Sequence, residues 1–162
     1  MGCTIRRVPA LPHIGDLNNL HRRMVFAEFA REHAEIYAMH APLYRKRTAE
    51  IIEIGKKVSD QELASARANS SALRRELEAA MAHASIDLWV SPSAPGPAPE
   101  GIQATGDPNM NLPWTHAGMP VITLPAGRAK NGLPLGLQFI APFGADELLL
   151  AWCQALVGGG CF

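Results

Sequence analysis

The chain has 162 residues, a length typical of one domain, and 48% of them are hydrophobic, as in globular proteins with a sizeable core. Fifteen basic and fifteen acidic side chains give a formal net charge of zero, so no overall field attracts nucleic acid or an acidic membrane. No apolar run approaches the ~20 residues of a membrane span, and three cysteines without a CxxC pair indicate a reduced, cytoplasmic protein.

The N-terminal half begins with a predicted short strand and two helical pieces. Residues 3–8 have the composition of an edge strand placed before Pro9. A long helix follows with Asp16 as its N-cap, and Pro42 is expected to end or kink it because proline lacks the amide donor. A second helical piece covers residues 43–54 and stops near Gly55. The apolar stripe of the first helix recurs at spacings of three and four: Leu20, Met24, Ala27, Ala30, Ala34 and Tyr37.

The next predicted helix begins with a capping box. Ser59 is followed three residues later by Glu62, a pair in which each side chain bonds the other residue's backbone amide. We expect this helix to end at residues 83–85 and residues 86–90 to form a short, buried strand. Its buried face is Leu63, Leu73, Leu77, Ala80, Met81 and Ala84.

Residues 91–113 form an unusually long stretch rich in turn residues, with six prolines and three glycines. A loop of this length inside a compact domain is uncommon and is usually functional or disordered. Two interpretations remain, a linker between domains and an ordered loop that wraps a site. Strand signals resume directly afterwards, which favours the ordered loop.

Residues 118–140 predict a β-hairpin. Residues 118–127 and 132–140 are expected to pair as antiparallel strands closed near Asn131-Gly132, a dipeptide that suits positive φ. Pro125 and Pro134 cannot donate to the ladder, so each should lie at a strand end or on an edge strand. Gly136 weakens the return strand unless another group approaches it closely.

A last helix is predicted from Asp146, a cap candidate, to the glycines at 158–160. The coarse order of elements is then β-α-α-α-β-loop-β-β-α. This order indicates a mixed α/β fold, in which helices flank a mixed sheet.

Motifs that carry chemistry by themselves are missing from the sequence. It contains no GxSxG, GxGxxG, GxxxxGK[ST] or HExxH, so neither a cofactor nor a metal is predicted, although His33 and His40 lie two helical turns apart. Ser91 and Ser93 lie at a strand end, but no base is identified for either, and we interpret them as turn serines. The cations within residues 44–50 are interpreted as a solvated helix face.

The hairpin carries a specific pattern: GMP at 118–120, PAG at 125–127 and GLPLGLQ at 132–138. These stretches resemble the C-terminal part of the amidase-signature family, as do DLWVSPSAPGPAP and EIIEIGKKVSDQELASARA further upstream. The resemblance covers nearly the whole chain. It implies a single, partial amidase-like domain over residues 1–162, with 91–113 as a loop within it.

The resemblance also implies a function. Members of this family hydrolyse carboxylic amide bonds with a serine, a second serine in a cis peptide and a lysine, which belong to an N-terminal portion with a GGSSGGS-like run. This sequence has no such run, and none of its lysines matches the catalytic one, so no catalytic residue carries over and we expect the chain to be inactive alone. The long loop is expected to line the substrate funnel, with four residues in contact with a small amide substrate: Asp107, Asn111, Trp114 and His116. The alternative roles are structural, Asp107 capping a turn and Trp114 lying in the core.

Three functional interpretations remain open. The chain is the C-terminal portion of an amide hydrolase, or half of a split amidase whose catalytic portion is another chain, or a non-catalytic remnant that serves as a binding or scaffold module. The expected partners are a small amide in the full-length context, an N-terminal amidase portion, or further copies of this chain. Neither nucleic acid nor a membrane is expected.

Overall fold

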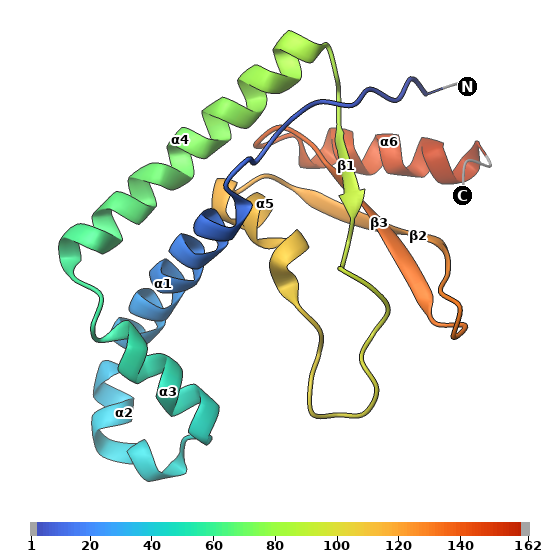
Figure 1. The fold of residues 1–162 in the computed structure, drawn as a ribbon. Helices are drawn as coiled ribbons and strands as arrows, with labels where there is room; N and C mark the ends of the chain where they lie inside the picture. Colours follow the sequence, from blue (N-terminus) through green and yellow to red (C-terminus); the bar gives the residue numbers. More distant parts are fainter. Residues whose placement is uncertain (1–2, 160–162) are drawn as a thin grey trace. The chain divides into compact units, whose positions relative to one another are not determined.

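The computed structural model describes residues 3–159 and divides the chain into two compact units. We call residues 13–72 the helical unit; the sheet unit comprises the segment up to Pro12 and everything from Leu73 onward. Helix α4 (Asp60–Ala84) contributes its beginning to the helical unit and its end to the sheet unit. The predicted α/β class is confirmed, whereas the single-domain interpretation stays a prediction (Figure 1).

The helical unit contains α1 (Ile14–Glu32), α2 (Ala34–His40), the 3-10 turn η1 (Ala41–Leu43), α3 (Lys46–Gly55) and the start of α4. Helices α1 and α3 pack closely at Gly55, where an added Cβ would overlap the Phe26 carbonyl and lie 2.8 Å from the Ala30 Cβ. A small apolar core of Ala27, Val58 and Leu63 lies beside this contact.

Three ion pairs connect α1 to the first turns of α4: Arg23–Glu62 at 2.7 Å, Glu28–Arg67 at 2.8 Å and Arg31–Asp60 at 2.6 Å. The predicted capping box is confirmed, because Ser59 N donates to Glu62 Oε2 (3.0 Å) and Glu62 N donates to Ser59 Oγ (3.2 Å). These contacts fix where α4 begins. The ion pairs are exposed, so each contributes little to stability.

Several predicted boundaries in this half are wrong. Residues 3–11 form no strand, since no other segment within residues 3–159 pairs with them. Helix α1 starts at Ile14, which puts Asp16 in the first turn rather than at the N-cap, where its charge still favours the helix dipole. The long helix is interrupted earlier than expected, at His33, which separates α1 from α2. The expectation that Pro42 ends it is confirmed, because α2 stops at His40, Pro42 lies in η1 and α3 begins only at Lys46.

The sheet unit has a three-stranded antiparallel sheet within residues 3–159, in the order β1-β3-β2. Its strands are β1 (Trp89–Pro92), β2 (Val121–Arg128) and β3 (Pro134–Ile140). The predicted hairpin is confirmed, although β2 begins three residues later than expected. Both proline predictions hold, because Pro134 opens β3 and Pro125 lies on an edge strand beside a bulge.

The strand expected at residues 86–90 is displaced to β1. Helix α4 ends in a Schellman-type cap: Ser85 takes a positive φ of 51°, and Ile86 N donates to Met81 O at 3.1 Å. Because Ile86 completes this cap, extended pairing with β3 starts only at Trp89, opposite Ile140.

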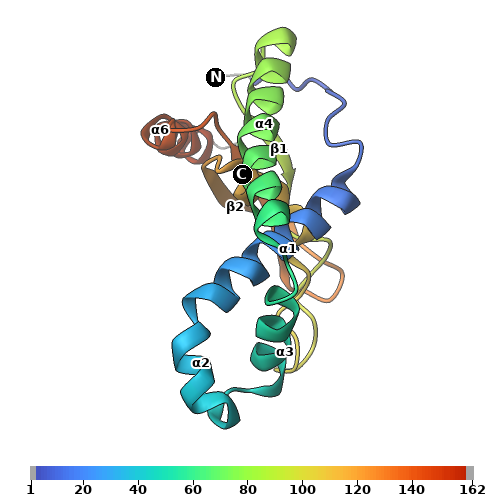
Figure 2. The same cartoon turned by 90° about the vertical axis from the view of Figure 1, so that its left-hand side faces the viewer.

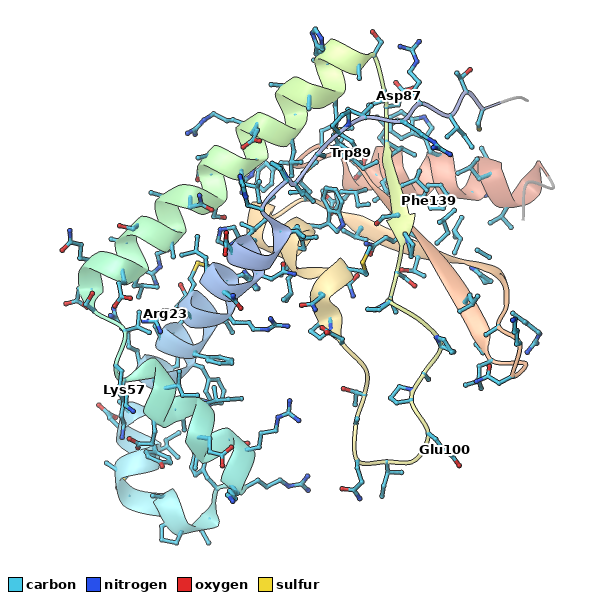
Figure 3. All side chains as sticks on the ribbon, in the orientation of Figure 1. Arg23, Lys57, Asp87, Trp89, Glu100 and Phe139 are labelled. Atoms are coloured by element: carbon cyan, nitrogen blue, oxygen red, sulfur yellow. The ribbon has the colours of Figure 1, made fainter. Side chains whose placement is uncertain are left out.

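The two faces of the sheet are covered differently. Helix α6 (Asp146–Gly158) packs Leu149 and Cys153 against Phe139 of β3. On the opposite face, Trp89 of β1 packs on Trp114 of α5 (Leu112–Ala117), with ring centroids 6.3 Å apart (Figure 3 labels Trp89 and Phe139). Figure 2 shows the elements from a second side. Helix α6 has Ala145 at its N-cap, so the predicted cap Asp146 lies in the first turn; Cys161 and Gly160 lie outside the described residues.

Candidate substrate-binding site

The long loop is held at both of its ends by strand β3. At its start, Ser93 N donates to Gly136 O at 3.1 Å, which continues the pairing beyond β1. At its end, the 3-10 turn η2 (Pro108–Met110) leads into α5, and Asn111 Nδ2 donates back to Ser93 O at 3.3 Å. Such contacts at the base are typical of an ordered loop that folds onto the sheet, and not of a flexible linker between domains.

Gln138 joins the two ends of the loop to the centre of the sheet. Its side chain is fully buried, and Nε2 donates to Ser91 Oγ and to Met110 O, each at 2.8 Å. Its Oε1 is buried without a hydrogen-bond partner in the described part of the chain. Gln138 was predicted only as part of a motif, although a polar residue inside an apolar strand is a signal that could have found it.

Helix α4 makes a second set of contacts, also not predicted, that hold the segments on either side of the hairpin. Arg74 Nε donates to Ala117 O at 2.7 Å, and the guanidinium lies 3.6 Å from the centre of the Phe143 ring. One turn further on, Glu78 Oε1 accepts from Phe143 N at 3.0 Å. Spaced four residues apart on one helix face, Arg74 and Glu78 therefore hold the segments that precede β2 and follow β3.

Two of the four predicted substrate contacts are exposed at the base of the loop. The Asp107 carboxylate accepts from Asn109 N (3.0 Å) and from Asn109 Nδ2 (2.7 Å), so it caps η2. Asn111 follows at the N-cap position of α5. The structure brings these two side chains to either end of the same short turn.

The other two predicted contacts are buried. Trp114 is 5% exposed and stacks obliquely on Trp89, while His116 is 1% exposed. Both belong to α5, whose inner side covers the sheet. Trp114 and His116 thus have little surface for a ligand in this structure, and contact of the four residues with substrate stays a prediction.

Within residues 3–159, neither Ser91 nor Ser93 at the end of β1 has a base as a hydrogen-bond partner. The partner of Ser91 Oγ is the amide of Gln138, which donates a proton and cannot accept one. A nucleophilic serine needs a base within hydrogen-bond reach. Within residues 3–159 there is also no cluster of three side chains able to hold a metal ion.

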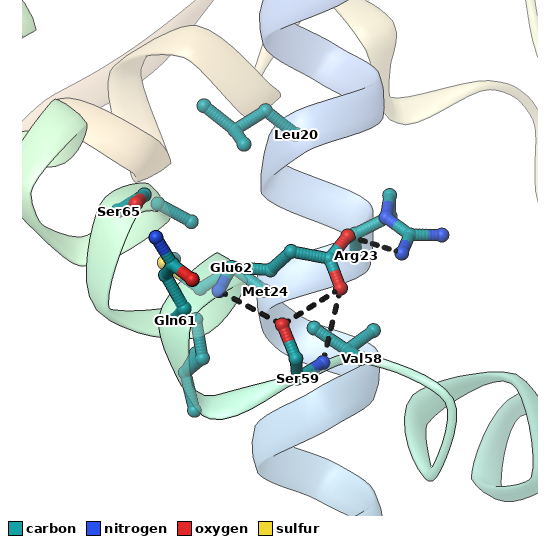
Figure 4. A pocket seen from close by; sticks show the side chains of 10 residues that line it. Leu20, Arg23, Met24, Val58, Ser59, Gln61, Glu62 and Ser65 are labelled. Carbon is teal, nitrogen blue, oxygen red and sulfur yellow. Dashed lines mark hydrogen bonds and ion pairs between the residues drawn. The ribbon is translucent and has the colours of Figure 1, made fainter.

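The helical unit contains a hollow of about 300 Å³ at the start of α4 (Figure 4). Its polar wall is engaged internally: Glu62 accepts from Ser59 and from Arg23, and these contacts lower the pKa of the Glu62 carboxyl, the backbone bond from Ser59 most strongly. The remaining wall is largely apolar, with Leu20, Met24 and Val58. The charged groups that line the hollow, Arg23 and Glu62, are thus engaged with each other and with Ser59 in contacts that fix the start of α4.

These features define a class of fold but no reaction. The class is an α/β unit in which an antiparallel hairpin anchors a long loop. A family model described as Amidase matches residues 13–150, and the chain therefore belongs to the amidase family. Two relatives are glutamyl-tRNA(Gln) amidotransferase subunits, one from Deinococcus deserti, 40% identical over 85 residues, and one from Trichormus variabilis, 38% identical over 72 residues. The aligned parts cover 46% and 40% of this chain but 18% and 15% of the relatives.

Solved structures agree with the family. A crystal structure of an amidase has a TM-score of 0.81 and 27% sequence identity, over 94% of this chain and 38% of that one. A chain of a vestigial protein complex, described as revealing the evolutionary origins of an s-triazine catabolic enzyme, matches the fold at a TM-score of 0.78 and 18% identity, over 96% of this chain and 36% of that one. The chain spans less than two-fifths of these two structures.

Proposed function

We propose that this chain supplies the C-terminal, loop-bearing portion of an amidase-signature amide hydrolase. The serine, cis-serine and lysine that hydrolyse the C–N bond then lie outside these residues, and the chain alone is inactive. The match of the family model to residues 13–150, in a sequence without a Gly/Ser-rich run, carries this proposal.

The part assigned to this chain is to hold the loop that faces a small amide substrate. Asp107 and Asn111 are exposed at its base and offer the carboxylate and amide groups that orient an amide by hydrogen bonds. Trp114 and His116, which are buried in α5, contribute by keeping this helix packed. Gln138 holds η2 to the sheet through Met110 O, and Arg74 holds α5 to α4 through Ala117 O.

A graft tests the proposal directly. The C-terminal part of the 27% identical amidase is replaced by the matching residues of this chain, and hydrolysis of that amidase's substrate is measured. We expect a folded, active hybrid. Asn111→Ala should raise its KM more than it lowers kcat, because a contact made equally in ground and transition states is lost. Asn19→Ala, an exposed asparagine on α1, is the matched control and should change neither.

The chain alone provides the second arm. It should neither hydrolyse simple amides nor react with a fluorophosphonate. Within residues 3–159, Ser91 and Ser93 have no base as a hydrogen-bond partner, and Ser59, whose Oγ donates to the Glu62 carboxylate, is held in a capping box that lowers the pKa of that carboxyl. Stoichiometric labelling of one serine, lost in Ser91→Ala or Ser93→Ala, would overturn the proposal. A hybrid that folds by circular dichroism but hydrolyses nothing would also contradict it.

A split amidase is the second candidate. The relatives are single subunits of a multi-subunit amidotransferase, and one solved neighbour comes from a protein complex; both observations support a partner chain. In this case a separately expressed N-terminal amidase portion should bind this chain and gain activity. If the N-terminal portion gains no activity and this chain is a stable, unreactive monomer, these results favour the third interpretation, a remnant that serves as a binding or scaffold module.

A further inference from the structure

The turn between α2 and α3 carries large apolar side chains on its outer surface. Ile36, Met39 and Leu43 are 52%, 68% and 81% exposed. Ile36 and Met39 lie three residues apart on one face of α2, and Leu43 is the last residue of η1, which follows α2 directly. We call these three side chains the apolar tip. In Figures 1 and 2 this segment lies where the chain turns back from α2 to α3 within the helical unit.

The inner side of the same turn is already filled. Tyr44 bonds to His33 Nδ1 at 2.8 Å and packs edge-on against Tyr37, with ring centroids 5.1 Å apart. His33 in turn stacks on Phe29 at 4.1 Å, and the Lys56 ammonium lies 4.6 Å from the Tyr37 ring centre. These ring contacts fix the turn from its other side and leave the apolar tip exposed.

Positive charge follows the tip directly. Arg45, Lys46 and Arg47 are all exposed, and within residues 3–159 none of the three forms an ion pair, in contrast to Lys56, which pairs with Glu53. Residues 36–49 contain these three cations and no carboxylate, between Glu35 and Glu50. The zero net charge of the whole chain therefore conceals a locally cationic, apolar turn.

We propose that this turn docks on an anionic lipid bilayer surface, with the apolar tip inserted among the headgroups and Arg45, Lys46 and Arg47 against the lipid phosphates. Three side chains fall far short of the ~800 Å² per partner that a specific protein interface buries. Interfacial binding needs no such area, because it adds the insertion of a few apolar groups to the attraction between cations and anionic lipids. No helix within residues 3–159 is long and apolar enough to cross a bilayer, so the mode is attachment to the surface.

The test is sedimentation of the full chain with vesicles of phosphatidylcholine alone or mixed with phosphatidylglycerol. We expect binding to the mixed vesicles that weakens as salt is raised. Changing the three cations together to glutamine should weaken binding about a hundredfold, at ~1 kcal/mol per charge. Met39→Ser with Leu43→Ser should weaken binding at least about tenfold. Ile102→Ser, which removes a 94% exposed apolar side chain from the long loop, is the matched control and should bind like the parent.

The readout does not depend on amide hydrolysis, so this inference and the proposed function can fail separately. Absence of binding to mixed vesicles would overturn it, as would equal loss from Ile102→Ser and from the tip variant. A tip variant that retains vesicle binding but no longer self-associates would assign the surface to a second copy of the chain and likewise overturn it. The substituted side chains are exposed, so circular dichroism should show an unchanged fold.

Discussion

Gly136 lies in the middle of β3, next to β2 on one side and to the start of the long loop on the other. It pairs with Pro125 of β2, and its carbonyl accepts from Ser93 N. An added Cβ would lie 2.5 Å from Ser93 Oγ, 2.5 Å from Thr123 Cγ2 and 3.4 Å from Ser93 Cβ. The close approach expected from a glycine inside a strand is thus made by two side chains.

The size of the effect follows from these distances. The Ser93 hydroxyl can rotate away, but the Thr123 methyl is on a β-branched residue with few rotamers, so the strand itself must shift. Overpacking of this kind costs roughly 1–3 kcal/mol. At about 2–4 °C per kcal/mol for a chain of this size, Gly136→Ala should lower Tm by several degrees. Gly136→Val should lower it further because it adds two methyl groups.

Urea unfolding followed by tryptophan fluorescence, at one fixed protein concentration, measures the change. Adding Ser93→Ala and Thr123→Ser to Gly136→Ala removes both contacting atoms and should recover part of the loss, as a mutant cycle would show. Gly15→Ala is the control, since nothing lies within 4 Å of its added Cβ in α1, and it should leave stability unchanged or raise it. An unchanged or raised stability for Gly136→Ala would refute the close-approach reasoning.

Three further predictions concern groups elsewhere in the chain. Burial lowers the pKa of His21 below 6.5, so the unfolded chain binds a proton at this histidine more readily than the folded chain. The free energy of unfolding should therefore fall as the pH drops through that region. In urea titrations at several pH values, His21→Asn should make this dependence on pH weaker. Cys3 is exposed and should react quickly with iodoacetamide, whereas Cys153, whose pKa burial raises, should react only after unfolding, as peptide mass spectrometry can show. Ser59→Ala removes the N-cap of α4 and should cost about 1 kcal/mol in thermal or urea unfolding, while Ser71→Ala on the same helix should cost less.

Elements specified by short-range chemistry were predictable from the sequence. The capping box needs only Ser59 and Glu62 at their spacing, and the hairpin needs a turn dipeptide between two apolar runs. By contrast, α5 was missed because six residues inside a proline-rich loop have no helical period to detect. Pro113 suits a first helical turn, but burial of the inner side of α5 against the sheet is what stabilises so short a helix.

The candidate site was predictable only as a region. The family motif placed the loop correctly beside the hairpin, since both ends of the loop bond to β3. Which loop residues face outward depends on how α5 packs, and that packing buries Trp114 and leaves Asn111 exposed. The role of Gln138 depends on strand register, because only the pairing of Ser91 with Gln138 brings the two side chains together. Neither relation is encoded in local spacing.

The sheet itself predicts how the isolated chain behaves. Both β1 and β2 are edge strands of the described sheet, and an unpaired edge is a template for another strand. The two edges are not equally open. Strand β1 has four residues and ends at Pro92, while the far half of β2 is blunted by Pro125 and the bulge that follows it. The regular stretch 121–124 of β2 is therefore the most accessible pairing edge.

We accordingly expect self-association that increases with concentration and uses this edge. Val121→Lys should reduce it in sedimentation velocity, because a lysine on an edge strand opposes pairing and Val121, which is 36% exposed, leaves room for the ammonium to reach water. Val157→Lys removes an equally apolar, exposed side chain from α6 and should have little effect. If both variants reduce association equally, general apolar contact rather than strand pairing is responsible. If the parent chain is monomeric at all concentrations, the short strand, the proline and the bulge already protect both edges.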